Sequence, residues 1–229
     1  MKNKILVVAA HPDDEVFGLG GTLFSHLKNG DSIFVIFMSD GVTGRDKVYD
    51  PILRKNEINE RKEMAVKASQ KYNCSNIDFI DLPNLRMDQE NLLDITKIIE
   101  EYIVKFDINI IYTHNRGDTN IDHRITHDAT VIACRPIPNS LITSIRLFET
   151  CSSTEYSVSS LSSQFQPNLF IDISDYVNHK RELLEIYKKE LRPMPHPRSL
   201  EAISARDIYR GTSVGYFSAE CFMEVRKKI

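Results

Sequence analysis

The chain has 229 residues and a formal net charge of −3, with 41% hydrophobic and 27% charged residues. This length is enough for one domain with a sizeable core, and we predict a single domain over residues 1–229. The charge balance excludes the overall basic character typical of nucleic-acid-binding proteins. No apolar run has the length of a membrane span or signal peptide, so we expect a cytoplasmic protein that binds neither nucleic acid nor membranes.

Apolar runs alternate with segments of helical period along the first 135 residues. Strands are predicted at 5–10, 32–38, 76–82, 107–113, 141–149 and 168–173. Helices are predicted at 19–29, 51–72, 89–106, 122–134 and 174–191, the last with Ser174 as its cap. A proline-broken loop at 192–199 precedes one more helix, and the serine-rich stretch 152–163 is expected to be a surface loop. The alternation predicts an α/β fold, a Rossmann-like, mostly parallel sheet with helices on both faces.

The four cysteines indicate reduced thiols. Cys74, Cys134, Cys151 and Cys221 lie far apart, and the sequence contains no Cys-x-x-Cys pair. Cysteine zinc sites use closely spaced pairs, so we do not expect one here.

Polar clusters follow three of the predicted strands. They span residues 11–15, 39–45 and 114–127, after the first, second and fourth strands. In a doubly wound sheet, ligands bind beyond the carboxyl ends of the strands. The three loops are therefore expected to converge on one crevice.

The first cluster, H-P-D-D-E, has the residue types of a metal site. His11 and Asp14 are three residues apart in a turn, and zinc binds imidazole nitrogen and carboxylate oxygen at about 2 Å. His123, at the start of a predicted helix, is the best-placed third ligand. Two histidines and one carboxylate with an open position are typical of catalytic zinc, and Asp13 is then free to act as general base. Such a cation would also offset the repulsion among three consecutive acids.

Plainer interpretations of these residues stay open. Most His-x-x-Asp pairs are ordinary turn residues, and Asp13 or Asp14 could cap the following helix. His123 and His127, four apart on a helix, could lie on a solvated face.

Several longer motifs carry a resemblance to a known family. They are A-A-H-P-D-D-E with G-L-G-G-T-L, then L-P-N-L-R-M-D, G-D-T-N-I-D-H-R and H-P-R-S-L-E-A-I-S-A-R-D-I-Y-R-G-T. Together they resemble the PIG-L/LmbE-like zinc-dependent N-deacetylases, which act on N-acetylglucosamine units. The resemblance implies an LmbE-like fold, one Zn²⁺ per chain on His11, Asp14 and His123, and Asp13 as general base.

The resemblance also implies roles for residues outside this cluster. His196 matches a late-loop histidine near the active site, where it could stabilise an oxyanion or protonate the leaving amine; the alternative is a rigid Met-Pro-His-Pro turn. Arg61 resembles an arginine that contacts the sugar, and otherwise is an exposed helix residue. Asn120, a candidate for substrate binding, stands where the family commonly has histidine, and the role of that histidine could pass to His114, Asn120 or His127. The remaining candidates for substrate binding are Arg86 and Asp88.

The predicted reaction is removal of an acetyl group from an N-acetylated amino sugar, either a soluble sugar, a glycoside or a nucleotide sugar. One alternative is hydrolysis of a non-sugar amide. Another is a non-catalytic sugar- or nucleotide-binding module in which the G-L-G-G turn holds a phosphate. Relatives are often oligomers, so a homo-oligomer is also expected.

Overall fold

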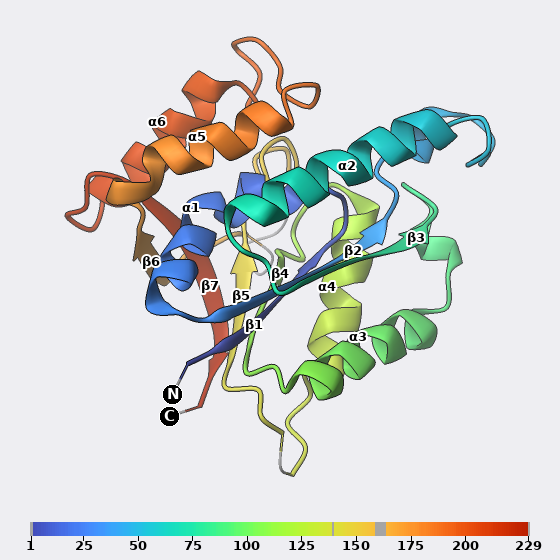
Figure 1. The fold of residues 1–229 in the computed structure, drawn as a ribbon, viewed down its shortest axis with the longest axis horizontal. Helices are drawn as coiled ribbons and strands as arrows, with labels where there is room; N and C mark the ends of the chain where they lie inside the picture. Colours follow the sequence, from blue (N-terminus) through green and yellow to red (C-terminus); the bar gives the residue numbers. More distant parts are fainter. Residues whose placement is uncertain (1, 139, 159–163, 229) are drawn as a thin grey trace.

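The computed structural model describes residues 2–138, 140–158 and 164–228, and these form a seven-stranded sheet (Figure 1). The strand order is β3-β2-β1-β4-β5-β7-β6. The strands are β1 (Lys4–Ala9), β2 (Ser32–Ser39), β3 (Asn76–Leu82), β4 (Ile110–His114), β5 (Ser144–Phe148), β6 (Leu169–Asp172) and β7 (Ala219–Lys227). The first five pair in parallel, whereas β7 runs antiparallel to both β5 and β6. The predicted mostly parallel sheet is confirmed.

Helices cover both faces of the sheet, as predicted (Figure 1). They are α1 (Asp14–Asn29), α2 (Lys55–Lys71), α3 (Leu92–Phe106), α4 (Ile121–Ala133), α5 (Val177–Ile186) and α6 (Leu200–Thr212), with short 3₁₀ turns η1 (Thr43–Arg45), η2 (Met87–Gln89) and η3 (Ser174–Tyr176). The pair α3 and α4 packs together on one face, while α1, α2, α5 and α6 lie on the other. No helix among the described residues is long and apolar enough to cross a membrane.

The central strand β1 divides the hydrophobic core into two halves. Ile5, Val7 and Ala9 face the half under α1, α2 and α5, and Leu6 and Val8 face the half under α3 and α4. All five side chains are fully buried. Because both faces are covered, the strand is an uninterrupted apolar run. The turn that carries the first polar cluster directly follows this buried strand, so its position relative to the sheet is well defined.

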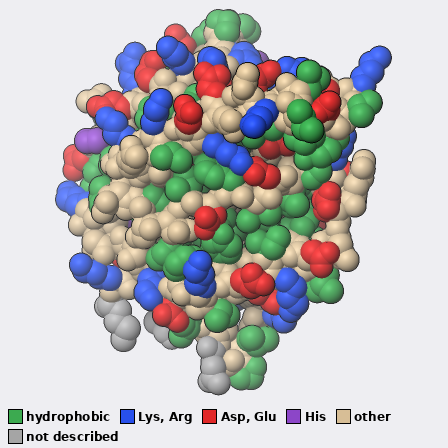
Figure 2. All heavy atoms as spheres, turned by 45° about the vertical axis from the view of Figure 1, so that its right-hand side comes forward, with side chains coloured by type: hydrophobic (Ala, Val, Ile, Leu, Met, Phe, Trp, Pro, Cys, Tyr) green, Lys and Arg blue, Asp and Glu red, His purple; other side chains and the backbone are tan. Residues whose placement is uncertain are grey.

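The molecular surface mixes charges of both signs. On the face that Figure 2 shows, acidic and basic side chains are interspersed, with hydrophobic side chains between them. This distribution agrees with the small net charge of −3.

The first helix begins earlier than predicted and bends at the glycine-rich turn. It starts at Asp14 rather than residue 19, and Leu19 has non-helical backbone angles (φ −148°). A Cβ on Gly18 would lie 2.5 Å from the Phe148 ring, and one on Gly21 would lie 2.8 Å from Ile173. The glycines therefore allow the bent helix to approach the sheet closely.

The bend also exposes backbone donors, and the chain satisfies them itself. The carboxylate of Glu220 accepts hydrogen bonds from the N–H groups of Gly21 (2.9 Å) and Thr22 (2.7 Å). This carboxylate occupies the position in which a bound phosphate would be held. The phosphate-binding interpretation of the G-L-G-G turn therefore loses its basis.

The C-terminal part departs most from the sequence prediction. A helix after the proline-broken loop was expected and is present as α6, but β7 was not predicted. Ser174 opens η3 and does not cap α5, whose N-cap is Tyr176. The strand expected at 107–113 begins three residues later, since the backbone of Asp107 is left-handed and ends α3. Residues 159–163 of the predicted serine-rich loop lie outside the described residues.

Candidate metal centre and active site

Three of the predicted ligands come together beyond the carboxyl ends of β1 and β4. The Nδ1 atom of His11 lies 3.1 Å from Oδ2 of Asp14 and 3.3 Å from Nε2 of His123. The Nε2 atom of His123 lies 3.5 Å from the same Asp14 oxygen. All three residues are buried. Three donor atoms from two distant segments thus face one another, as a metal site requires.

The electrostatics of this group fit a divalent cation. The buried Oδ1 of Asp14 has no hydrogen-bond partner among the described residues. Burial alone would raise the pKa of Asp14, but the charge of His123 and the hydrogen bonds to His11 and His123 hold that pKa well below its usual range. Burial would lower the pKa of His11, yet hydrogen bonds to Asp122 and Asp14 raise it to about 10. A cation would take the place of the protons that these charges retain, and two imidazoles with one carboxylate are ligands that zinc favours.

A carboxylate contacts the second ring nitrogen of each of the two histidines. The Nε2 atom of His11 lies 3.0 Å from Oδ2 of Asp122, and Nδ1 of His123 lies 2.9 Å from Oδ2 of Asp118. In metal sites, a carboxylate on the second imidazole nitrogen fixes the tautomer and the ring orientation. Our sequence analysis did not identify Asp118 or Asp122, although both lie in the same short segment as His123.

Asp122 also ties the loop after β3 to the site. Its Oδ2 accepts hydrogen bonds from the backbone N–H of Leu85 (2.7 Å) and the side-chain amide of Asn84 (3.2 Å), and its Oδ1 accepts one from Met87 N–H (3.3 Å). Burial would raise the pKa of Asp122, but the contact with His11 and these donors lower it. The carboxylate therefore stays ionised and able to hold His11.

A second group of possible donors, His114, Asp118 and His123, supports the first. The Nε2 atom of His114 accepts a hydrogen bond from Ala10 N–H (2.8 Å), which leaves no lone pair on that nitrogen for a metal. Burial holds the pKa of His114 well below its usual range, so the ring is neutral. It stacks on His123 with ring centroids 3.9 Å apart. His114 thus packs against the candidate ligand His123 and does not itself offer a lone pair of Nε2 to a metal.

Asp13, the predicted general base, has one occupied and one free oxygen. Its Oδ2 accepts hydrogen bonds from Nη2 of Arg61 (2.9 Å) and Nη1 of Arg198 (3.1 Å). Its Oδ1 is buried and has no hydrogen-bond partner among the described residues. Burial raises the pKa of Asp13, and the two arginines oppose that rise. Asp13 is the N-cap residue of α1, but its side chain makes no capping hydrogen bond.

Glu15 supports the unusual backbone of Asp13. The φ angle of Asp13 is 142°, which is rare for a residue with a side chain. Glu15 Oε2 accepts the Asp13 N–H (3.1 Å), and Tyr187 donates its hydroxyl to Glu15 Oε1 (2.8 Å). Burial raises the pKa of Glu15 to about 8. Glu15, the third acid of the H-P-D-D-E motif, therefore stabilises the turn that carries the other two acids.

Arg61 is a buried residue, so the interpretation as an exposed helix arginine is wrong. Its Nε donates to the Pro12 carbonyl (2.6 Å), and its guanidinium pairs with Glu190 as well as Asp13. His196 is half-buried in the proline-broken loop, where its Nδ1 accepts the backbone N–H of Arg198 (3.0 Å). Arg198 was not identified from the sequence.

The other three predicted substrate residues have local contacts. Asn120 caps α4 by accepting the N–H of Asp122 (2.9 Å). Arg86 donates from Nη2 to the carbonyl of Asp46 (2.8 Å), and Asp88 is exposed in η2. Among the described residues, no hydrogen bond or ion pair joins these side chains to the three metal-ligand candidates.

Comparison with known proteins gives relatives of the same fold. Escherichia coli (strain K12) has the uncharacterized deacetylase YaiS, which is 28% identical over 142 residues, or 60% of this chain and 71% of YaiS. The N,N'-diacetylchitobiose deacetylase of Pyrococcus horikoshii superposes with a TM-score of 0.74 at 19% identity, covering 98% of this chain and 84% of that one. GalB, the 4-carboxy-2-hydroxymuconate hydratase of Pseudomonas putida KT2440, gives 0.75 at 18% identity, covering 100% and 98%. These structures establish the fold, and GalB shows that the fold also hosts another reaction.

The family assignment rests on the sequence itself. Residues 6–134 match the PIG-L family, described as GlcNAc-PI de-N-acetylase. The match spans more than half of the chain and includes His11, Asp14 and His123. The predicted resemblance is thereby confirmed, and with it the expected class of enzyme, an N-deacetylase. The chain belongs to the PIG-L family of de-N-acetylases.

Proposed function

We propose that the protein is a cytoplasmic zinc-dependent hydrolase that removes the acetyl group from a soluble N-acetylated amino sugar or its conjugate, with one Zn²⁺ per chain. Membership in the PIG-L family supports the N-deacetylase class. The observation that carries the proposal is the free, buried Oδ1 of Asp13, next in the chain to the donor group of His11, Asp14 and His123. Zinc rather than another divalent ion fits two imidazoles and one carboxylate.

The bound cation would polarise the acetyl carbonyl and lower the pKa of a water molecule. In our proposal, Oδ1 of Asp13 takes a proton from that water as the water oxygen attacks the acetyl carbon. The C–N bond then breaks, and protonated Asp13 returns its proton to the leaving nitrogen. One water is consumed, and the products are acetate and the protonated amine, which also takes up the second proton of that water.

The remaining predicted residues take roles around this reaction. His196 lies in the loop that also supplies Arg198 to Asp13, and we propose that its ring stabilises the oxyanion or protonates the amine. Asn120, Arg86 and Asp88 lie on the loops after β3 and β4 and are proposed to contact the remainder of the substrate. Arg61 is proposed to act on the sugar from beside Asp13.

Acetate release by the zinc-loaded protein tests this proposal. The panel is free N-acetylglucosamine, its nucleotide-sugar forms, simple N-acetylglucosaminides and a non-sugar acetamide. Release from the sugars is expected to stop when a chelator removes the metal. Asp13→Asn should retain zinc and lose most turnover, about 10²–10⁴-fold, the range of general acid–base catalysis. Asp175→Asn, which changes an aspartate with an 82% exposed side chain, is the matched control and should keep wild-type activity.

The outcomes separate the alternatives. Release only from the non-sugar acetamide would favour the amidohydrolase alternative. Stoichiometric zinc without acetate release from any compound would contradict the deacetylase and point to a different reaction on the same fold. Full turnover by zinc-loaded Asp13→Asn would contradict the assignment of the base.

A further inference from the structure

Arg198 joins the proposed base to the loop that follows β5, and the proposed reaction gives this arginine no role of its own. Its Nη1 donates to Oδ2 of Asp13 (3.1 Å), and its Nε donates to the hydroxyl of Ser152 (3.0 Å) and reaches the carbonyl of Cys151 (3.4 Å). These contacts span 185 positions of the sequence in the case of Asp13. One guanidinium thus connects three segments around the site.

We propose that Arg198 is a positioning residue for the deacetylation: it holds Oδ2 of Asp13 so that Oδ1 faces the reacting water. The inference rests on the proposed function, in which Asp13 is the base. A carboxylate is planar, so fixing the direction of one oxygen also fixes the other. Arg61 and Arg198 both bind Oδ2 and leave Oδ1 without a partner. A general base must lie within hydrogen-bond reach of the proton it removes, and the two arginines set that geometry.

The two arginines differ in how they are held. The side chain of Arg61 is 5% exposed and also binds the Pro12 carbonyl and Glu190. It is part of the fixed frame of the turn. The side chain of Arg198 is 18% exposed, so it is the arginine on the more open side of Asp13. Its removal should therefore disturb the base more than the fold.

Packing holds Arg198 in place independently of Asp13. Its guanidinium carbon lies 4.9 Å from the centroid of the Phe17 ring. Nη1 also lies 3.9 Å from Oε2 of Glu190, a second acidic neighbour. A planar guanidinium that is stacked on one face and hydrogen-bonded at its edge is preorganised, which a lysine ammonium is not.

Steady-state kinetics with two variants tests the proposal. Arg198→Met keeps the length and the apolar contact with Phe17 but removes the charge and the donors. We expect its kcat to fall about 100-fold, within the range of general-base catalysis, with KM changed less than about threefold. Arg198→Lys should recover part of this loss. Arg192→Met is the matched control and should keep wild-type kcat, because Arg192 is exposed in the same loop and its side chain donates to backbone carbonyls alone among the described residues.

Three further readouts distinguish positioning from a structural role. Zinc affinity by calorimetry and the visible spectrum of the Co²⁺-loaded protein should be unchanged in Arg198→Met. Guanidinium ion at a non-denaturing concentration should raise kcat of Arg198→Ala. A rise in KM at constant kcat, or loss of the metal, would overturn the proposal.

A crystal structure of Arg198→Met decides the matter even without turnover. We expect the Asp13 carboxylate to rotate away from its wild-type orientation while Asp14 stays in place. An unchanged Asp13 carboxylate would overturn the positioning role. Absence of acetate release by the wild-type protein would instead count against the proposed function, so the two failures can be told apart.

Discussion

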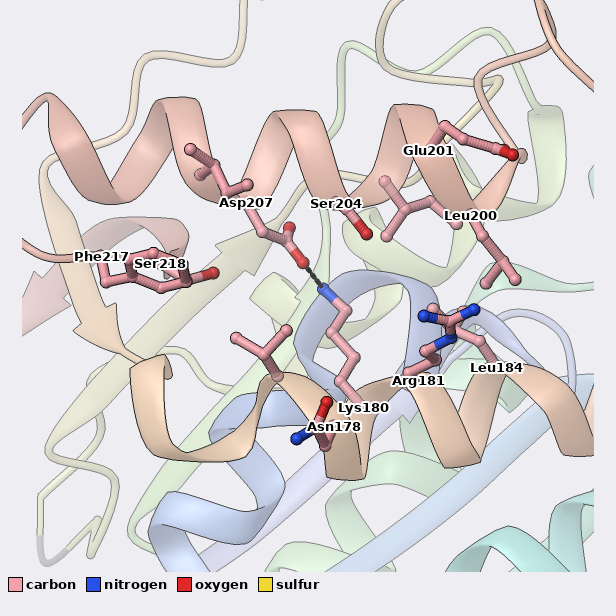
Figure 3. A pocket seen from close by; sticks show the side chains of 13 residues that line it. Asn178, Lys180, Arg181, Leu184, Leu200, Glu201, Ser204, Asp207, Phe217 and Ser218 are labelled. Carbon is pink, nitrogen blue, oxygen red and sulfur yellow. Dashed lines mark hydrogen bonds and ion pairs between the residues drawn. The ribbon is translucent and has the colours of Figure 1, made fainter.

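The molecule contains two buried clusters of charged side chains, and they differ in whether every carboxylate oxygen has a partner. Lys180, on α5, is 3% exposed, and its Nζ lies 2.6 Å from Oδ2 of Asp207 and 2.8 Å from Oε1 of Glu220. Figure 3 shows this lysine and Asp207 facing each other between α5 and α6, beside a cleft of about 350 Å³. Arg206 pairs with the other Asp207 oxygen (3.0 Å). The acids of this cluster are matched by cations and backbone donors of the chain itself.

The metal centre leaves buried oxygens unmatched. Oδ1 of Asp13 and Oδ1 of Asp14 have no hydrogen-bond partner among the described residues. A buried polar atom without a partner costs about 1–3 kcal/mol. Such unpaired oxygens destabilise the folded protein unless a ligand binds to them, and the carboxylates of the Lys180 cluster do have partners within the chain. Among the described residues, the buried carboxylate oxygens without a partner are those of Asp13 and Asp14, and these oxygens distinguish the candidate metal centre from the Lys180 cluster.

The largest expected effect follows from removing a candidate metal ligand. His123→Ala deletes one of three donors, so we expect loss of measurable zinc binding and of deacetylation. Wild-type protein should gain about 2.7 kcal/mol in stability at a free zinc concentration 100 times Kd, and the variant should gain none. Thermal unfolding with and without zinc measures this difference. His179→Ala, at an exposed histidine of α5, is the control that should keep the zinc response.

A complementary change removes the cation of the Lys180 cluster. Lys180→Met leaves Asp207 and Glu220 buried without their shared partner, so the unfolding free energy should fall by about 3–5 kcal/mol. Zinc affinity should stay at the wild-type value. Denaturant unfolding and calorimetry measure the two quantities. A loss of zinc affinity with little loss of stability would contradict the division into a structural and a functional cluster.

A smaller change weakens the support of one ligand. Asp122→Asn keeps the shape of the side chain but removes the charge that orients His11, so zinc affinity should fall about 10–100-fold. Competition with a metal chelator measures that affinity. Asp128→Asn, on the same helix but paired with Arg116, is the matched control. Equal affinities in the two variants would remove Asp122 from the metal centre.

The fold could be predicted where burial dictates the sequence. Strands β1 and β2 are buried on both faces and are therefore continuous apolar runs. Strand β7 mixes buried residues such as Cys221 with charged ones such as Glu220 and Glu224. Glu220 is buried because its carboxylate accepts hydrogen bonds from the backbone of the α1 bend. A charged residue at a buried position interrupts the hydrophobic pattern, so the strand could not be predicted from it.

The site could be predicted where a residue type alone carries the chemistry. His11, Asp14 and His123 are ligand types at strand ends, and the structure brings their donor atoms together. Arg198 and Asp122 lie in motifs as well, but their contacts with Asp13 and His11 join residues 185 and 111 positions apart, and no local pattern predicts such a contact. Asn120 illustrates the converse: it lies in a motif, yet its hydrogen bond is that of an ordinary helix cap.

The last expected effect is a pH dependence of stability in the metal centre. In metal-free protein, the folded-state pKa of His11 is raised from 6.5 to about 10 by Asp122 and Asp14, despite burial. Its stabilising contribution is therefore full below pH 6.5 and is lost as the pH rises toward 10. The pKa of Glu15, raised by burial to about 8, gives a decline in the same direction that ends near pH 8. Burial would lower the pKa of Lys180, but Asp207 and Glu220 raise it above its usual value of 10.5, so Lys180 stays charged across this range.

The loss of stability from pH 8 to 10 is thus expected from His11 within a metal centre in which the pKa of His123 is also raised, by Asp14 and Asp118 against the effect of burial. Metal-free protein should lose stability across this pH range in denaturant unfolding. Protein loaded with one equivalent of zinc should not, because His11 carries no proton at the nitrogen that binds the metal. Parallel stability curves for the two forms would mean that zinc does not replace the proton of His11, and the distinction between the two clusters would then lose its electrostatic basis.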